Sequence, residues 1–297
     1  NLVTPIWWDD IWLNEAFATW ISYKTMDAVY PGTGFDLAPQ RAAIGVMGSD
    51  SLANARQIRN PITRNADILD AFDGITYRKG GGVLSMFENF VGEEAFRDGM
   101  RLHMRRFEDG VADVNDFMAS LADGSKNPDV IESFTSFIMQ PGIPYLGVNF
   151  TCPAIDAGLV TVSQSRYAPL GSGIDPQAQS WTIPFAIKMN GANGERTIRD
   201  MFAGETLEIP LDGGCPDWVM PNADGSGYWR FNLNSEAWQS LIDNYAALSA
   251  GEQLSFADSS TAAFAAGDIS ASALLAAIEV NANGDWGAAS RPLSKKQ

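Results

Sequence analysis

The chain has 297 residues, of which 45% are hydrophobic and 11% aromatic, which is enough for about two globular domains and excludes a disordered polymer. Its 36 acidic and 20 basic residues give a formal net charge of −16, which repels phosphate backbones and anionic lipid surfaces, so no nucleic acid partner is expected. No apolar run approaches the roughly 18 residues that a membrane span needs, and the first residues lack the basic-then-apolar pattern of a signal peptide.

Residues 1–145 are predicted to be mostly helical. From Ile11 the sequence contains neither Gly nor Pro until Pro31, and Asp9 and Asp10 suit the start of a helix. Further helices are expected over 75–91, 93–107, 113–122 and 129–139. Residues 140–144, Gln-Pro-Gly-Ile-Pro, then break the helical pattern, so a domain boundary is predicted near residue 145.

Over 146–233 the residue pattern changes to short runs that are typical of β-strands and are separated by turns. The runs expected to form strands are 159–167, 181–189, 206–211 and 228–232. Residues 190–194, Asn-Gly-Ala-Asn-Gly, are typical of a hairpin, and the whole segment predicts a small β-sandwich. Helical periodicity returns over 234–297, with Ala-rich helices to about residue 280 and a frayed tail over 281–297. The predicted fold class is therefore multidomain α+β.

Two cysteines occur, Cys152 and Cys215, with no C-x-x-C motif and no histidine nearby, which excludes a zinc finger and a redox motif. One possibility is a disulfide bond that closes a long loop and indicates an exported protein. The alternative is a pair of buried thiols.

Glu15 lies in an aromatic run that also contains Trp7, Trp8, Trp12 and Trp20. On a helix it shares its face with residues three, four, seven and eight positions away, none of which is a cation. Burial of an unpaired carboxylate costs several kcal/mol. The pattern therefore predicts a compensating group: an Arg or Lys from another segment, a proton on the acid, or a metal ion.

The chain contains one histidine, His103. It falls on the apolar side of the expected helix 93–107, beside Met100 and Phe107, which favours a packed core histidine over a metal ligand. A single histidine cannot form a His-rich zinc site, and it argues against Ser-His-Asp and Cys-His catalysis. The G-x-S-x-G, P-loop and strand-linked G-x-G-x-x-G motifs are also absent.

A second unusual stretch, 72–87, contains three consecutive glycines, Gly80 to Gly82. Each glycine costs a helix about 1 kcal/mol relative to Ala, so close approach by another element or a ligand is expected. Just before them, Tyr77 carries a phenol that could donate a hydrogen bond to a developing oxyanion. The alternative is a tyrosine packed beside a tight helix crossing.

Both stretches contain specific motifs, Trp7-Trp-Asp-Asp-Ile-Trp-Leu-Asn-Glu-Ala-Phe-Ala18 and Ile75-Thr-Tyr-Arg-Lys-Gly80. Weaker motifs occur at 137–144, 181–184 and 227–232. In these features the chain resembles the aminopeptidase-N-like zinc metallopeptidases, the gluzincin family that includes leukotriene hydrolase. The resemblance covers nearly the whole chain. It implies the helical half of a thermolysin-like catalytic domain over 1–145, a β-sandwich over 146–233 and the start of a helical domain over 234–297.

In that family one zinc ion is held by an H-E-x-x-H motif and by a Glu farther along the chain within a Trp-Leu-Asn-Glu motif. The resemblance therefore implies that Glu15 is a zinc ligand and that Tyr77 is the catalytic tyrosine, whose hydroxyl stabilises the tetrahedral oxyanion. By the family's spacing the second His would lie shortly before Asn1. We therefore expect both His ligands, the general-base Glu and the upstream Gly-x-Met-Glu-Asn segment to be missing.

Two positions depart from the family pattern. Ala16 stands where the family usually has Gly, a change that is not expected to disturb the helix. Ser22 stands where many members carry an acidic residue on the same helix face as the ligand. Such a carboxylate often orients a ligand His, so its loss bears on zinc affinity.

The predicted function is thus that of a fragment of a zinc aminopeptidase, which removes N-terminal residues from peptides with a free N-terminus, and the fragment alone is expected to be inactive. Two alternatives remain: a non-catalytic binding scaffold of the same fold, and an epoxide hydrolase on the same zinc framework. The acidity and the potential bond between Cys152 and Cys215 favour an exported or periplasmic protein.

Overall fold

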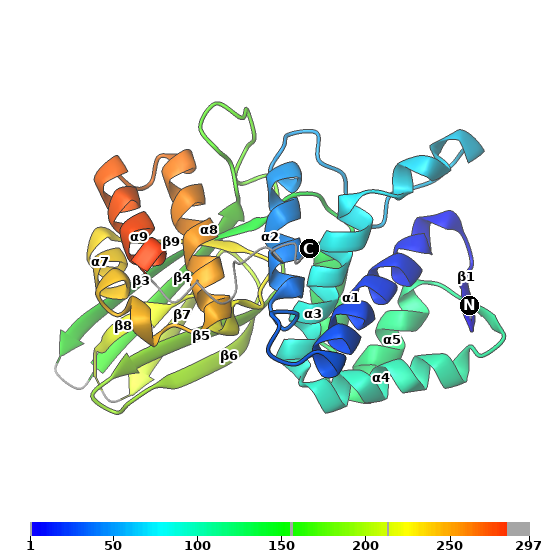
Figure 1. The fold of residues 1–297 in the computed structure, drawn as a ribbon, viewed down its shortest axis with the longest axis horizontal. Coiled ribbons are helices and arrows are strands. Elements are labelled where there is room, and N and C mark those ends of the chain that lie inside the picture. Colours follow the sequence, from blue (N-terminus) through cyan, green and yellow to red (C-terminus); the bar gives the residue numbers. More distant parts are fainter. Residues whose placement is uncertain (1, 155–156, 213, 284–297) are drawn as a thin grey trace, which may run out of the picture.

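The structure, a computed structural model, describes residues 2–154, 157–212 and 214–283. Figure 1 shows α1 and α3 to α5 gathered at one end of the molecule, with the strands of the two larger sheets and α7 to α9 at the other. The helices are α1 (Ile11–Val29), α2 (Ala38–Asp50), α3 (Gly80–Val91), α4 (Glu93–Arg106), α5 (Val114–Ser125), α6 (Val130–Ile138), α7 (Ser235–Asp243), α8 (Ala250–Ala266) and α9 (Ala271–Asn283). A π-helical turn, η3 (Ile75–Lys79), leads directly into α3.

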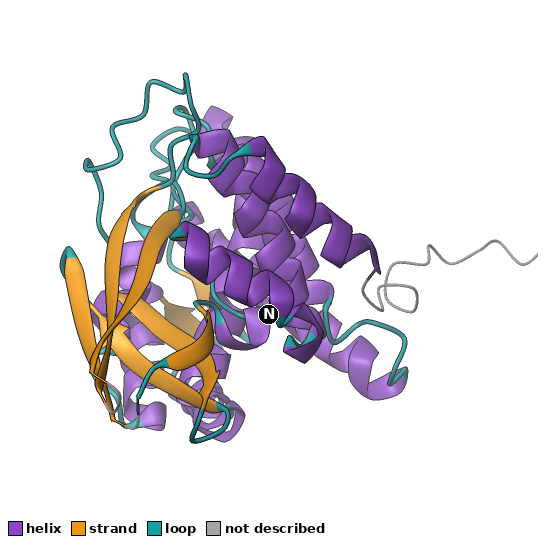
Figure 2. Cartoon of the chain, turned by 90° about the vertical axis from the view of Figure 1, so that its left-hand side faces the viewer, coloured by secondary structure: helices purple, strands orange, loops and turns teal. Residues whose placement is uncertain are grey.

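Two sheets follow the helical half (Figure 2). The strands of the chain are β1 (Val3–Pro5), β2 (Gly110–Ala112), β3 (Pro144–Ala154), β4 (Ala157–Arg166), β5 (Ile183–Gly191), β6 (Arg196–Phe202), β7 (Thr206–Asp212), β8 (Pro216–Met220) and β9 (Arg230–Leu233). One sheet has the order β7-β4-β3-β9, in which only β3 and β9 are parallel, and the other is an antiparallel sheet of order β6-β5-β8. The short strands β1 and β2 form a separate parallel pair.

Most of the expected elements are present. The mixture of helices and sheets confirms the α+β class, and the expected hairpin at 190–194 joins β5 to β6. The expected helix 75–91 is divided into the π-helical turn and α3. Helix α2 and strands β1, β2, β3, β6 and β8 were not predicted from the sequence. Of the tail expected over 281–297, residues 281–283 belong to α9 and the rest lies outside the described residues.

Helix α1 buries only one narrow stripe. Trp12, Ala16 and Trp20, at four-residue intervals, are its buried residues and point into the aromatic core of the helical half. The Trp12 indole lies 6.0 Å from the Phe134 ring, measured between centroids, and Phe134 lies 4.5 Å from Phe87. This packing fixes the rotation of α1 about its axis, so residues beside the stripe face outward at its edges.

The three glycines let α3 pack closely against two other helices. A Cβ atom on Gly80 would lie 2.7 Å from the Cβ of Ala16 in α1, and one on Gly82 would lie 2.9 Å from the Cβ of Ala43 in α2. Real Cβ atoms do not approach this closely, so the expectation of a close approach is confirmed. The same contact brings the turn that precedes α3 next to α1.

A disulfide bond joins Cys152, in β3 of the four-stranded sheet, to Cys215, the residue before β8 of the three-stranded sheet. The bond closes a loop with a sequence separation of 63 residues. It therefore ties the two sheets together covalently. Among the helices described up to residue 283, none is both long enough and apolar enough to cross a bilayer.

Candidate active site

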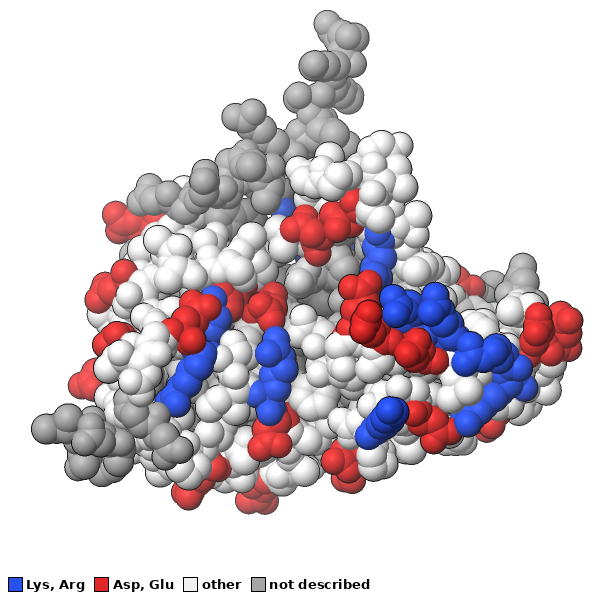
Figure 3. All heavy atoms as spheres, turned by 90° about the horizontal axis from the view of Figure 1, so that it is seen from below, with Lys and Arg blue, Asp and Glu red and all other residues white. Residues whose placement is uncertain are grey.

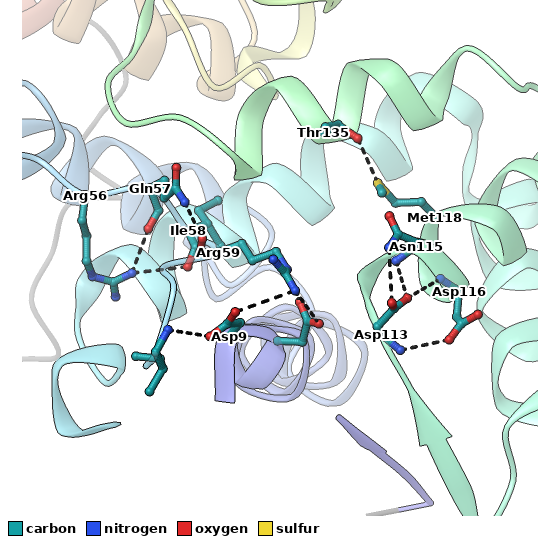
Figure 4. Close-up of polar contacts among 12 residues, drawn as sticks. Asp9, Arg56, Gln57, Ile58, Arg59, Asp113, Asn115, Asp116, Met118 and Thr135 are labelled. Carbon is teal, nitrogen blue, oxygen red and sulfur yellow. Dashed lines mark hydrogen bonds and ion pairs between the residues drawn. The ribbon is translucent and has the colours of Figure 1, made fainter. Parts of the chain in front are cut away.

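The start of α1 is held by the loop at 56–62, as Figure 4 shows. Asp10 is buried, and its carboxylate accepts a hydrogen bond from Arg59 Nε at 2.7 Å. Asp9 accepts a hydrogen bond from the Ile62 amide at 2.6 Å. The hydrogen bond to Asp10 is the main cause that raises the pKa of Arg59, so the guanidinium stays charged at neutral pH. The sequence suggested that these residues cap the helix, but neither side chain makes a capping hydrogen bond. Both instead anchor the start of the helix to the loop.

Glu15 lies one residue before Ala16, at the edge of the buried stripe of α1, and its side chain is half-buried. The burial of this carboxylate, from which the sequence argument for a compensating group started, is therefore only partial. Trp12 points into the core, whereas Trp7 and Trp8 are 49% and 36% exposed. Helical geometry explains the difference, because four tryptophans so close in sequence cannot all surround one side chain. The expected cost of full burial does not arise.

The π-helical turn that carries Tyr77 is fixed at its start by Asp73. One Asp73 oxygen accepts hydrogen bonds from the amides of Ile75 and Thr76, at 2.8 and 3.3 Å. Arg56 pairs with the Asp73 carboxylate, through Nε at 3.1 Å, and donates to the Thr76 hydroxyl at 2.8 Å. Turns of this kind occur often at functional sites, because the extra residue redirects the side chains that follow.

Tyr77 and Glu15 meet at this point. The Tyr77 hydroxyl lies next to the Glu15 carboxylate, close enough for the two groups to interact. Loss of solvent, then the negative charge of Glu15 and then its capacity to accept the phenol proton in a hydrogen bond raise the pKa of Tyr77 above its usual value. The phenol thus keeps its proton at neutral pH and remains a hydrogen-bond donor. The structure brings together the two residues that the sequence motifs singled out separately.

No cation compensates Glu15 among the described residues: no salt bridge to its carboxylate is present there. Lys24, the basic residue closest in sequence, pairs with Glu88 and Glu93 instead. Elsewhere on this half of the molecule the cations are interleaved with carboxylates, as in the pair of Arg106 and Asp123, and Figure 3 shows this mixing of signs on one face. The ion-pair alternative for Glu15 therefore has no support in the described residues.

A cavity of about 610 Å³ opens beside Glu15, between β1, α1, α4 and α5. Its wall is largely apolar and includes Phe17, Met100, Met104 and Phe117. Concave, mostly apolar sites with a few polar groups are where small molecules and peptides bind. Glu15 thus lies on the wall of a space that is large enough for a ligand.

His103 also lines this cavity, but it belongs to the core. It is 5% exposed, and its ring lies 5.1 Å from Phe107 and 5.5 Å from Phe117, measured between centroids. Burial lowers the pKa of His103, which therefore stays neutral at pH 7. This agrees with the reading of a packed histidine.

The described residues supply one candidate ligand for a metal site, Glu15. Glu15 can offer carboxylate oxygens, but among the described residues no group of three or more His, Cys, Asp or Glu side chains could hold a metal ion. A catalytic zinc ion needs three protein ligands. The described residues therefore do not make a complete zinc site, and no catalytic step through a metal follows from them.

Comparison with known proteins shows what this arrangement is similar to. Residues 1–139 match the Peptidase family M1 domain. Probable aminopeptidase 1 of Saccharolobus solfataricus is 31% identical over 238 residues, which are 79% of this chain and 28% of that protein. Endoplasmic reticulum aminopeptidase 2 of Homo sapiens is 27% identical over 274 residues, 82% of this chain and 28% of that protein. Probable M1 family aminopeptidase 1 of Encephalitozoon cuniculi is 34% identical over 200 residues, 66% of this chain and 22% of that protein. The chain thus spans about a quarter of the length of these curated relatives.

Proposed function

We propose that the chain is part of a zinc-dependent aminopeptidase, an enzyme that removes N-terminal residues from peptides. The proposal starts from the match of residues 1–139, through which the chain belongs to the M1 peptidase family. The observation that carries the proposal is the proximity of the Tyr77 hydroxyl to Glu15, which lies on the wall of the cavity. A tyrosine held against a carboxylate that has no cationic partner in the described residues is what an oxyanion donor beside a metal ligand requires.

In this proposal Glu15 is one zinc ligand. Bound zinc would polarise the peptide carbonyl and lower the pKa of a bound water. Tyr77 would donate its proton in a hydrogen bond to the oxygen on which negative charge develops. The apolar cavity wall would exclude water from the reacting groups.

The remaining donors, two His ligands and a general-base Glu, would come from outside the 297 residues. The relatives are several times longer than the part that this chain matches, which leaves room for such donors. Under this proposal the 297-residue chain alone binds zinc weakly and has no peptidase activity. We also propose the domain limits 1–145, 146–233 and 234–297 for its catalytic, sandwich and helical parts.

The test compares the isolated chain with the longest natural polypeptide that contains it. Zinc is measured by atomic absorption, and turnover is measured with an aminoacyl-nitroanilide and with an epoxide substrate. We expect stoichiometric zinc and aminopeptidase turnover in the long polypeptide only. Glu15→Gln should abolish both zinc retention and turnover, whereas Tyr77→Phe should lower kcat about 100- to 1,000-fold, leave a measurable residual turnover and keep the zinc. Full turnover in Tyr77→Phe would refute the assigned role, and epoxide turnover without peptidase turnover would refute the substrate class.

We further propose that the protein is exported or periplasmic. The disulfide bond between Cys152 and Cys215 supports this, because such bonds persist in oxidising compartments. Mass spectrometry after alkylation of protein from its native source, without reduction, should find no free thiol. Two alkylated cysteines would remove the argument.

A further inference from the structure

A fully buried ion pair involves Lys79, a residue close in sequence to the proposed catalytic tyrosine. Asp50, the last residue of α2, and Lys79, the last residue of the π-helical turn, are both 0% exposed, and their charged atoms lie 2.7 Å apart. Lys79 follows Tyr77 by two residues. Any movement of the Lys79 backbone is therefore transmitted to Tyr77 through a single intervening residue.

The pair is bound on its other side by two distant segments. The Gly142 amide donates to Asp50 Oδ1 at 2.9 Å, and Lys79 Nζ donates to the Gly142 carbonyl at 3.0 Å. The Tyr228 hydroxyl donates to Asp50 Oδ2 at 3.0 Å, and Lys79 Nζ lies 5.4 Å from the centre of the Tyr228 ring. Gly142 precedes β3 and Tyr228 precedes β9, so both belong to the entry into the four-stranded sheet.

Stability alone does not explain this arrangement. Two charges that leave water incur a large desolvation cost. Here burial lowers the pKa of Lys79, although the negative charge of Asp50 acts in the opposite direction. Apolar side chains of similar size would commonly fill such a site at least as well. An ion pair with hydrogen bonds also restrains the position of the backbone, because each hydrogen bond forms only over a narrow range of distances and angles.

We infer that the Asp50–Lys79 pair is a positioning device that holds the end of the π-helical turn so that Tyr77 stays against Glu15. Asp73 and Arg56 fix the start of the same turn, and Lys79 fixes its end. Because Gly142 and Tyr228 complete the device, the placement of Tyr77 depends on correct docking of the sheet half. The catalytic part of this inference rests on the proposed function, whereas its structural part does not.

The chain provides a matched control. Lys188 and Glu252 form a second buried pair, 2.9 Å apart, and Lys188 Nζ lies 5.6 Å from the centre of the Trp218 ring. This pair joins β5 to α8, in the half of the molecule that does not contain Glu15 and Tyr77. Lys188 is slightly more exposed than Lys79 and also pairs with Glu195 at 3.5 Å. Lys79→Met and Lys188→Met thus each remove the cation from a buried ion pair.

The first experiment is hydrogen exchange of the 297-residue chain, followed by mass spectrometry. We expect Lys79→Met to accelerate exchange of the amides of residues 76–82 at least about tenfold, and Lys188→Met to leave them unchanged. Tyr228→Phe removes one hydrogen bond to Asp50 and keeps the ring, so it should give the same pattern at about threefold and serves if Lys79→Met does not fold. Unchanged exchange of this peptide in Tyr228→Phe and in any folded Lys79→Met would overturn the inference.

The second experiment is a double-mutant cycle in the zinc-loaded peptidase that contains the chain. Lys79→Met should lower kcat about 10- to 100-fold with KM changed less than about threefold, and Lys188→Met should leave kcat unchanged. In a Tyr77→Phe background Lys79→Met should add less than about a twofold loss, because its effect passes through Tyr77. Independent, multiplicative losses would overturn the positioning role. Full turnover in Tyr77→Phe would instead refute the proposed function, and the exchange experiment would still decide the structural part.

Discussion

The Cβ atom of Ala16 lies 2.7 Å from the point where a Cβ on Gly80 would stand, so α1 and α3 meet with no space for a methyl group. Gly80→Ala improves helix propensity by about 1 kcal/mol, but the added methyl must displace α1. We expect the clash to prevail and the free energy of unfolding to fall by about 1–2 kcal/mol, measured by urea denaturation.

A glycine in open space serves as the control for that substitution. Gly45, inside α2, has no atom within 4 Å of an added Cβ. Gly45→Ala should therefore stabilise the chain by about 0.5–1 kcal/mol through helix propensity. If both variants gained stability, the close contact between α1 and α3 would be wrong.

Removal of the charge should destabilise the chain much less at Glu15 than at Asp10. Glu15 is half-buried and takes part in no salt bridge among the described residues, so Glu15→Gln should change the free energy of unfolding by less than about 0.5 kcal/mol. Asp10 is 1% exposed and paired with Arg59, so Asp10→Asn should cost about 1–3 kcal/mol. Thermal or urea unfolding of the two variants measures the difference. A larger loss for Glu15→Gln than for Asp10→Asn would indicate a structural role for Glu15 and weaken its assignment as a ligand.

His103 gives a direct test of burial, because the chain has no other histidine and its imidazole resonance needs no assignment. Burial lowers its pKa in the folded chain below the usual value of 6.5. The unfolded chain therefore binds the proton more readily between these two pKa values. Proton NMR should show a midpoint below 6.5, and the stability contributed by neutral His103, complete above pH 6.5, should decline as the pH falls through the folded-state pKa. In His103→Gln this part of the pH dependence should disappear.

The disulfide bond should add about 2–4 kcal/mol to the free energy of unfolding, because it closes a long loop in the unfolded chain. Cys152→Ser/Cys215→Ser should lose this amount in urea denaturation. The wild-type chain should lose the same amount in the presence of a reductant, whereas the double variant should be insensitive to it. Equal stability of the variant and the oxidised chain would show that the bond does not constrain the fold.

Periodicity and chain breakers predicted most helices of the first half, but they missed α2. The signal was present, because Ala43, Val46, Met47 and Asp50 are buried at helical intervals. Two exposed glycines of the helix, Gly45 and Gly48, and a charged residue within the buried stripe, Asp50, hid it. The short strand β8 was missed because it gains its stability by pairing with β5, a strand distant in sequence, and local propensity does not encode such pairing. Strand β6 pairs with β5 across the expected hairpin, but charged residues such as Arg196, Arg199 and Asp200 mask its β pattern.

For the candidate site, residue chemistry alone indicated that Glu15 needed a partner but could not identify it. The partner that the structure shows, Tyr77, lies in a segment whose proximity depends on the packing of Gly80 against Ala16. The buried pair of Asp50 and Lys79 left no local sequence signal, since charged residues are usually on the surface. Such a pair becomes visible only when the tertiary contacts of α2 are known.

The covalent link between the two sheets also determines how the protein responds to cleavage. The exposed turn between β5 and β6, at residues 192–195, lies inside the loop that Cys152 and Cys215 close. A protease that nicks this turn would therefore release nothing: the two pieces would migrate together on a gel and separate only after reduction. A non-reducing gel alone would therefore overlook the damage.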